Sequence, residues 1–148
     1  MQEWYFEDIP LKQPLTTSEY VVTEEELIAF ARKWDPLPIH TDPEAARASP
    51  HGGLIASSTY THAVASALGH RMAARPLIIA GNETTSRYLQ PVRPGDRLVA
   101  TSECVYKRES RSKPDRGIAR FMVTLRNQKG ESVLELESTL VVPRRDRG

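Results

Sequence analysis

The feature that most constrains the fold is a segment without charged side chains in the first half of the chain. Residues 54–68 contain no Pro, Gly, Asp, Glu, Lys or Arg. Their apolar members recur at the spacing of one helical face, namely Tyr60, Ala63, Val64, Ala67 and Leu68. A surface helix carries charged residues on its outer side, so a helix that lacks them is expected to be buried on most sides. The sequence therefore predicts a central helix around which other elements pack, with Gly69 as its end signal.

The second half of the chain predicts the elements that surround this helix. Strands are expected over residues 77–89, 97–108, 119–126 and 134–142, separated by Pro94-Gly95-Asp96, by a polar loop and by a hairpin at 127–130. In the third strand apolar and polar residues alternate, as they do when one face of a strand is buried. Four consecutive strands with short connections predict an antiparallel sheet.

The front of the chain predicts a short strand and two helices. Residues 16–22 are rich in residues that favour strands. Thr23 and Glu26 form a capping box that starts a helix, and Asp42-Pro43 marks a second helix start. With no linker or repeat, we expect one α+β domain over residues 1–148, in which an antiparallel sheet wraps around a long central helix.

Charge and composition exclude several function classes. Twenty basic and nineteen acidic residues give a net charge of +1, without the basic surplus of a nucleic-acid-binding protein. No apolar run approaches the ~20 residues that span a bilayer, and no export signal precedes the domain. The single cysteine, Cys104, excludes an internal disulfide and a thiolate metal cluster within one chain. We expect a cytoplasmic domain that binds no metal, membrane or nucleic acid.

The segment from Asp35 to His40 is the strongest candidate for chemistry. Pro36 and Pro38 push the residues before them toward extended backbone, which predicts a stiff, non-helical loop. Such a loop can hold a carboxylate and an imidazole at a fixed separation for acid–base catalysis. The alternative is a rigid connector in which Asp35 and His40 cap the neighbouring helices. The residues alone leave both interpretations open.

A second candidate is the approach to the central helix. His51-Gly52-Gly53 leads into the helix, whose unpaired amides are suited to polarise a carbonyl oxygen; the alternative is a turn that needs glycine. No phosphate-binding loop or serine-hydrolase elbow occurs. His62 and His70 are too far apart for an i, i+4 pair and are interpreted as ordinary helix residues.

In order and spacing, these segments resemble the MaoC-type acyl dehydratases, or (R)-specific enoyl-CoA hydratases, of the hot-dog superfamily. The resemblance extends from about residue 16 to 145. Its core is the family motif D-x-N-P-[hydrophobic]-H, which Asp35, Pro38, Ile39 and His40 match. The supporting segments are 41–43, 48–56, 89–96 and 127–131.

The resemblance implies a hot-dog fold and a site for acyl-thioester hydration. Asp35 and His40 correspond to the catalytic dyad, and Ser66 to a serine that assists it. The residues expected to bind substrate are Leu37, Gly53, Ser57 and Ser58. Coenzyme A would enter as part of the substrate, with no separate cofactor, and the protein would be a homodimer with acyl pockets between protomers.

Two positions depart from the family pattern. Leu37 replaces the motif asparagine, and Ser58 stands where the family has a glycine whose amide binds the thioester oxygen. Both acid–base groups are retained. The departures point to altered activity or to an unusual substrate.

Two other functions remain open at this stage. One is a thioesterase in which Asp35 or Glu83 activates water, and the other is a non-catalytic acyl-thioester-binding subunit. A basic stretch in the loop region near residue 110 is either a contact for coenzyme A phosphates or a solvated hairpin tip; it comprises Lys107, Arg108, Arg111, Lys113 and Arg116. The tail from about residue 144 is expected to be disordered.

Overall fold

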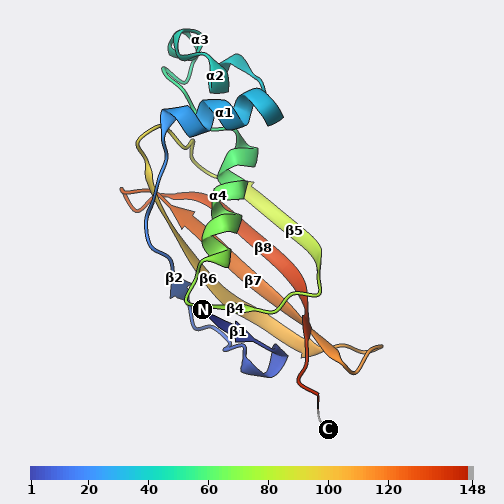
Figure 1. Cartoon of the computed structure of the whole chain (residues 1–148). Helices are drawn as coiled ribbons and strands as arrows, with labels where there is room; N and C mark the ends of the chain where they lie inside the picture. Colours follow the sequence, from blue (N-terminus) through green and yellow to red (C-terminus); the bar gives the residue numbers. More distant parts are fainter. Residues whose placement is uncertain (147–148) are drawn as a thin grey trace.

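The structure is a computed structural model that describes residues 1–146. A long helix lies across one face of an antiparallel sheet, and three shorter helices gather at one end (Figure 1). This is the predicted α+β architecture. Among residues 1–146, no helix combines the length and apolar character that crossing a bilayer requires.

The sheet is built from the second half of the chain, as predicted. Its long strands are β5 (Ala80–Tyr88), β6 (Arg97–Glu109), β7 (Arg116–Arg126) and β8 (Ser132–Pro143). With the short strand β2 (Leu15–Thr16) at one edge, the order is β2-β6-β7-β8-β5, and every pairing in this order is antiparallel. Asn127 and Gly130 close the predicted β7–β8 hairpin, where Gly130 has a positive φ of 75°. β5 forms one end of the sheet, and its side chains are mostly exposed.

The N-terminal part of the chain differs from the prediction in two ways. The strand expected at 16–22 is two short strands, β2 (Leu15–Thr16) and β3 (Tyr20–Val21), which both pair with β6. The first residues, for which no element was predicted, form β1 (Gln2–Trp4), which runs parallel to β4 (Ala74–Pro76), and the 3-10 turn η1 (Phe6–Asp8). These pairings depend on distant segments, so local sequence does not reveal them.

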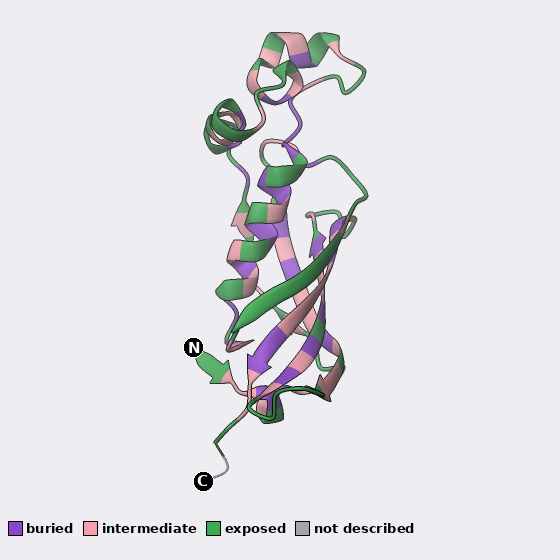
Figure 2. Ribbon diagram, turned by 90° about the vertical axis from the view of Figure 1, so that its right-hand side faces the viewer, coloured by how far each residue is buried: buried purple, intermediate pink, exposed green. Residues whose placement is uncertain are grey.

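The central helix, α4 (Ser58–His70), is shorter at its start than predicted and buried on one side only. Residues 54–57 are extended, and the helix continues through Gly69 to His70. Tyr60, Thr61, Val64, Ala65 and Leu68 face the sheet and are buried, while the opposite side, including Ser58, Ala63 and Ser66, is exposed (Figure 2). The expectation of burial on most sides is therefore wrong for the single chain. Small uncharged residues cover the exposed side.

Two apolar clusters fill the same face of the sheet. The larger lies beneath α4 and includes Tyr60, Leu98, Leu125 and Leu134. The smaller lies beneath the N-terminal segment and includes Phe6, Ile9, Cys104 and Phe121. Phe6 packs so closely on β7 that a Cβ at Gly117 would lie 2.2 Å from its ring. The N-terminal segment therefore covers the part of the sheet that α4 leaves open.

Hydrogen bonds to the Glu26 carboxylate connect the first helix to the central helix. α1 (Glu24–Trp34) begins at Thr23, whose hydroxyl accepts from the Glu26 amide as the capping box predicts. The Glu26 side chain does not complete the box, because it accepts hydrogen bonds from the Tyr60 hydroxyl at 2.8 Å and from the Tyr20 hydroxyl. Burial raises the pKa of Tyr60 well above its usual range, and the hydrogen bond and charge of Glu26 raise it further.

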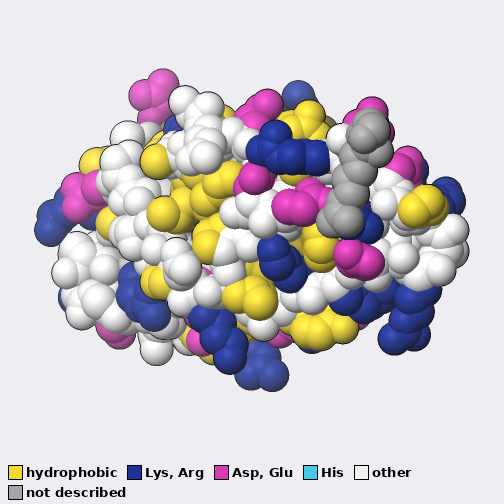
Figure 3. Space-filling view, turned by 90° about the horizontal axis from the view of Figure 1, so that it is seen from below, with side chains coloured by type: hydrophobic (Ala, Val, Ile, Leu, Met, Phe, Trp, Pro, Cys, Tyr) yellow, Lys and Arg dark blue, Asp and Glu magenta, His cyan; other side chains and the backbone are white. Residues whose placement is uncertain are grey.

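The C-terminal tail is ordered beyond residue 143, where the sequence predicted disorder from about residue 144. Arg144 pairs with Glu7 at 3.0 Å and Glu109 at 3.1 Å, and Arg145 pairs with Asp8 at 2.6 Å. Acidic and basic side chains are interspersed over this lower end of the molecule (Figure 3). Disorder from residue 144 is thus wrong for Arg144 and Arg145, because the N-terminal turn supplies carboxylates for both; residues 147–148 lie outside the described residues.

Candidate active site

The end of α1 and the start of the next helix place a carboxylate beside an imidazole. Pro36 follows α1, so the helix ends with Asp35 as its C-cap residue. The second proline begins the short helix α2 (Pro38–Thr41), which puts His40 within a helical turn. The prediction of a wholly non-helical loop is therefore wrong, since Pro38 suits the first helical position. Asp42, rather than His40, caps α3 (Pro43–Ala48), through bonds from the Glu44 and Ala45 amides.

The Asp35 and His40 side chains face each other. His40 Nε2 lies 3.5 Å from Asp35 Oδ2, with His40 almost fully buried and the Asp35 side chain 31% exposed. His40 Nδ1 lies 2.7 Å from the Ile55 carbonyl oxygen, which can only accept, so Nδ1 carries a proton. In the neutral ring, Nε2 is then an acceptor that points toward Asp35. Two acceptors at 3.5 Å are suited to hold one water molecule that donates to both.

Ser57 fixes the carboxylate. Its hydroxyl donates to Asp35 Oδ2 at 2.8 Å and accepts from the Thr59 amide at 3.2 Å, so the N-cap of α4 is bonded to the acidic residue. Ser57 is 0% exposed. Ser57 does not line the cavity in front of Asp35, and its contacts within the chain are those of a residue that positions Asp35. Its role in substrate binding stays a prediction.

A cavity of about 500 Å³ opens in front of the pair. Four of the predicted site residues line it, namely Asp35, Leu37, His40 and Ser58. Their roles stay predictions. Ser58 is the first residue of α4, and its amide donates to no group among residues 1–146. That amide is free for an oxygen of a bound molecule.

Several predicted residues lie elsewhere. Gly53 does not line the cavity; it lies five residues before α4, where an added Cβ would be 3.5 Å from Arg93. Ser66 lines a second cavity of about 240 Å³ near the other end of α4, two helical turns from Ser58. Within one chain, Ser66 therefore does not meet Asp35 and His40. His62 and His70 line that second cavity too, so they share a helix side that the i, i+4 argument did not reveal.

The cavity also contains residues to which the sequence analysis assigned no site role of their own. His51 lines its wall, as do Ile55, Thr61 and the end of β5 with the turn that follows, at 88–92. The Ala56 amide donates to the Val92 carbonyl at 2.7 Å, which joins this turn to the approach to α4. The sequence indicated this turn through Pro91 and through the resemblance of residues 89–96 to the family, but no spacing related it to Asp35.

Two residues of the basic stretch are engaged within the chain. Lys107 donates to the Phe6 and Ile9 carbonyls, and Arg116 pairs with Asp115 at 2.8 Å. The β6–β7 hairpin that carries these residues lies at the opposite end of the sheet from α2 (Figure 1). Within one chain, these side chains cannot reach a molecule at Asp35. Glu83 also lies outside the Asp35 cavity, on β5.

The fold and this site define the class, a hot-dog protein with an Asp–His pair at the start of its central helix. Comparison with known proteins agrees. Residues 6–125 match the sequence profile of the MaoC like domain, and the chain belongs to this family.

Three known proteins show how close the similarity is. A MaoC-like dehydratase from Rhodospirillum rubrum has 35% sequence identity and a TM-score of 0.89, covering 97% of this chain and 99% of that chain. YdeM of Bacillus subtilis, an uncharacterized protein, is 29% identical over 140 residues, which are 93% of this chain and 98% of YdeM. The (R)-hydratase PhaJ1 from Pseudomonas aeruginosa shares the fold at a TM-score of 0.78 and 22% identity, over 95% of this chain and 86% of that chain.

Proposed function

We propose that this protein catalyses the reversible hydration of a 2-enoyl thioester to a 3-hydroxyacyl thioester, with coenzyme A as the expected carrier. The observation that carries the proposal is the Asp35–His40 pair, with one imidazole nitrogen committed to the Ile55 carbonyl and the other aimed at the carboxylate. Family membership and the (R)-hydratase fold similarity add support.

The proposed reaction uses one water molecule held between Asp35 and His40. One of the two groups removes a proton as the water oxygen bonds to the β carbon. The carbonyl oxygen gains negative charge, which the Ser58 amide stabilises by donating a hydrogen bond. The α carbon then receives a proton from the pair, so water is added across the double bond and the thioester stays intact. The reverse sequence dehydrates the 3-hydroxyacyl thioester.

Purified protein tests the proposal with crotonyl-CoA, by following the ultraviolet absorbance of the enoyl thioester. We expect the absorbance to fall, and Asp35→Asn and His40→Ala each to lower kcat by at least about a thousandfold, because each removes a proton-transfer group. Asp42→Asn is a matched control, since it changes a nearby helix cap outside the cavity. Full activity in both site variants would exclude the assigned roles.

A thioesterase is the weaker alternative. Glu83, one of its two candidate bases, lies outside the Asp35 cavity of the same chain. The absence of free thiol during crotonyl-CoA consumption would exclude this activity. A non-catalytic binding subunit would bind acyl-CoA without turnover.

We also propose that the protein acts as a homodimer joined through β5. This strand ends the sheet, and the exposed side of α4 beside it carries small uncharged residues. Pairing of two β5 strands about a two-fold axis would be antiparallel. The end of β5 near Tyr88 would then lie beside the partner's beginning of β5. Tyr88 lines the Asp35 cavity and Ile78, just before β5, lines the second cavity, so the second cavity of one protomer would adjoin the Asp35 cavity of the other.

A further inference from the structure

Arg93 lies beside the Asp35 cavity and has no role in the proposed reaction. It follows Val92, a residue of the cavity wall, in the turn after β5. Its guanidinium Nη2 donates to the His51 carbonyl at 2.7 Å, and His51 also lines the cavity. The side chain therefore connects this turn to the loop at 51–53, at the edge of the cavity.

The charge of Arg93 is unpaired within the described part of the chain. None of the ion pairs among residues 1–146 involves it. The carboxylate of Asp96, three positions away, accepts instead from the Arg93 backbone amide at 2.9 Å and from the Gln128 side chain at 3.0 Å. A guanidinium has five N–H donors, and the His51 carbonyl takes one. The other donors of this half-buried side chain are available to an anion.

The loop at 51–53 supplies a further donor next to the guanidinium. Among residues 1–146, no group accepts from the Gly53 amide. A Cβ built on Gly53 would lie 3.5 Å from Arg93 Nη1, so the Gly53 backbone and the guanidinium are neighbours. Arginine side chains and backbone amides are common donors to phosphate oxygens. The pair is thus suited to a phosphate group.

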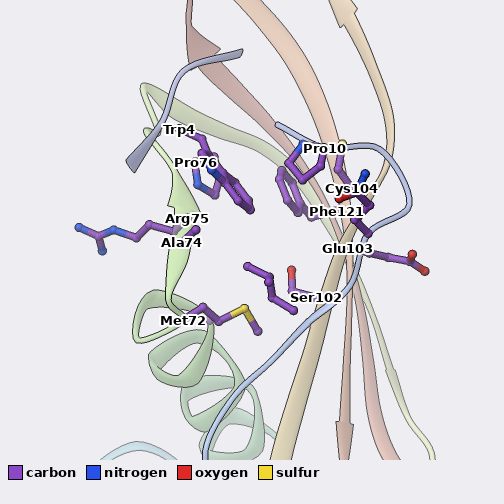
Figure 4. A pocket seen from close by; sticks show the side chains of 13 residues that line it. Trp4, Pro10, Met72, Ala74, Arg75, Pro76, Ser102, Glu103, Cys104 and Phe121 are labelled. Carbon is purple, nitrogen blue, oxygen red and sulfur yellow. The ribbon is translucent and has the colours of Figure 1, made fainter. Parts of the chain in front are cut away.

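Other cationic side chains are less suited to a phosphate at this site. Arg75 pairs with Glu3 at 3.3 Å, and its guanidinium extends away from the small pocket that Trp4 and Phe121 line (Figure 4). The basic stretch of the β6–β7 hairpin lies at the opposite end of the sheet from α2 (Figure 1). Arg93, by contrast, lies beside the cavity with its charge unpaired.

We infer that Arg93 and the Gly53 amide bind the phosphate group at the end of the pantetheine arm that carries the acyl group. The inference rests on the proposed function for the identity of the substrate. Coenzyme A and the prosthetic group of an acyl carrier protein share this phosphate. An arginine suits it because the planar guanidinium donates two parallel hydrogen bonds to phosphate oxygens.

The first test compares crotonyl thioesters of pantetheine, which has no phosphate, and of 4′-phosphopantetheine. The wild type should prefer the phosphorylated substrate by about tenfold or more in kcat/KM, chiefly through KM, because a charged hydrogen-bonded contact is gained. Arg93→Gln keeps a donor for the His51 carbonyl but has no charge, so this preference should fall to about twofold or less. Arg126→Gln, a control on an exposed arginine of β7, should retain the preference.

Three results would overturn the inference. They are a wild type without the preference, an Arg93→Gln protein that retains it, and an equal fall of kcat/KM for both thioesters. The last result would mean that Arg93 only holds the loop at 51–53. Crotonyl-CoA and a crotonyl acyl carrier protein distinguish the two sources of the phosphate. A larger loss of kcat/KM in Arg93→Gln with one of them identifies that carrier, and a loss with neither refutes the site.

The second test needs no turnover. Calorimetric titration with saturated butyryl-CoA should show an affinity about tenfold or more lower in Arg93→Gln than in the wild type. Equal affinities, or no binding to either protein, would refute the phosphate site even if hydration is observed. A loss of affinity in a protein that hydrates no enoyl thioester would instead refute the proposed function and retain the phosphate site.

Discussion

At the scale of single residues, Ser57 connects the stability of the central helix to the Asp35–His40 pair. Its hydroxyl both caps α4 and donates to Asp35. Ser57→Ala should lower the free energy of unfolding by about 1 kcal/mol, as loss of an N-cap does. It should also lower kcat about ten- to a hundredfold, because a hydrogen bond to a charged group is lost. Urea denaturation and crotonyl-CoA hydration measure the two effects.

A cap elsewhere separates the two roles of Ser57. Thr23→Ala removes the cap of α1, where the Thr23 hydroxyl accepts from the Glu26 amide at 3.2 Å, without touching Asp35. We expect a similar loss of stability and an unchanged kcat. An equal fall of kcat in both variants would show that Ser57 acts on activity only through helix stability.

The site residues differ in how far sequence predicts them. Asp35 and His40 were predictable because their five-residue separation is set by local proline chemistry and matches a motif. Ser57, by contrast, was assigned to the substrate. Its hydrogen-bond partner within the chain, Asp35, is 22 positions away, and the bond forms only when the end of α1 meets the start of α4. The same dependence on distant segments applies to Ser66. Its position along α4 follows from helical spacing, but the cavity that it lines does not.

At the scale of elements, the N-terminal segment depends on one glycine of β7. A Cβ at Gly117 would lie 2.2 to 2.7 Å from three atoms of the Phe6 ring. Gly117→Ala should therefore lower the free energy of unfolding by about 1–3 kcal/mol, through displacement of Phe6. Gly81→Ala is the matched control on another strand, because its Cβ would make an ordinary contact at 3.9 Å. Equal urea midpoints for the two variants would contradict the close packing of Phe6.

The contact between α1 and α4 should make stability fall at alkaline pH. Burial first, then the hydrogen bond and charge of Glu26, raise the pKa of Tyr60 above the value in the unfolded chain, about 10. The contribution is therefore fully present below pH ~10 and is lost as the pH rises above it. Urea denaturation between pH 8 and 11 should show this loss in the wild type and a smaller one in Tyr60→Phe. Identical pH dependence in the two proteins would remove Tyr60 as the cause.

Elements with a regular local pattern were predicted well. The alternation in β7 and the turns around Gly95 and Gly130 predicted the sheet because each depends on neighbouring residues. β1 and the divided strand at 16–22 could not be predicted, since their partners are distant and each is only two or three residues long. The prediction that α4 is buried on most sides was wrong for a related reason. Absence of charge indicates a surface that is covered, but it does not say whether the same chain covers it.

At the scale of the whole molecule, the proposed homodimer predicts complementation. Two variant chains that are each inactive alone should form a mixed dimer with one intact site. The complete site would combine Asp35 of one protomer with the second cavity of the other, which Gly69 lines. Gly69→Leu is designed to obstruct the second cavity. A mixture of Asp35→Asn and Gly69→Leu chains, denatured and refolded together, should recover about a quarter of wild-type activity on a ten-carbon enoyl-CoA, because half the dimers are mixed and each holds one intact site. If Asp35 and the second cavity of the same chain form the site, the mixture stays inactive.

The central claim is that the Asp35–His40 pair adds water to the acyl chain and leaves the thioester intact. The most direct measurement is turnover of crotonyl-CoA in ¹⁸O-labelled water, followed by mass spectrometry. We predict a 3-hydroxybutyryl-CoA that carries one ¹⁸O atom on the β carbon, no free thiol, and no labelled product from Asp35→Asn or His40→Ala. Label in a free carboxylic acid together with released coenzyme A would contradict the claim and identify a thioesterase.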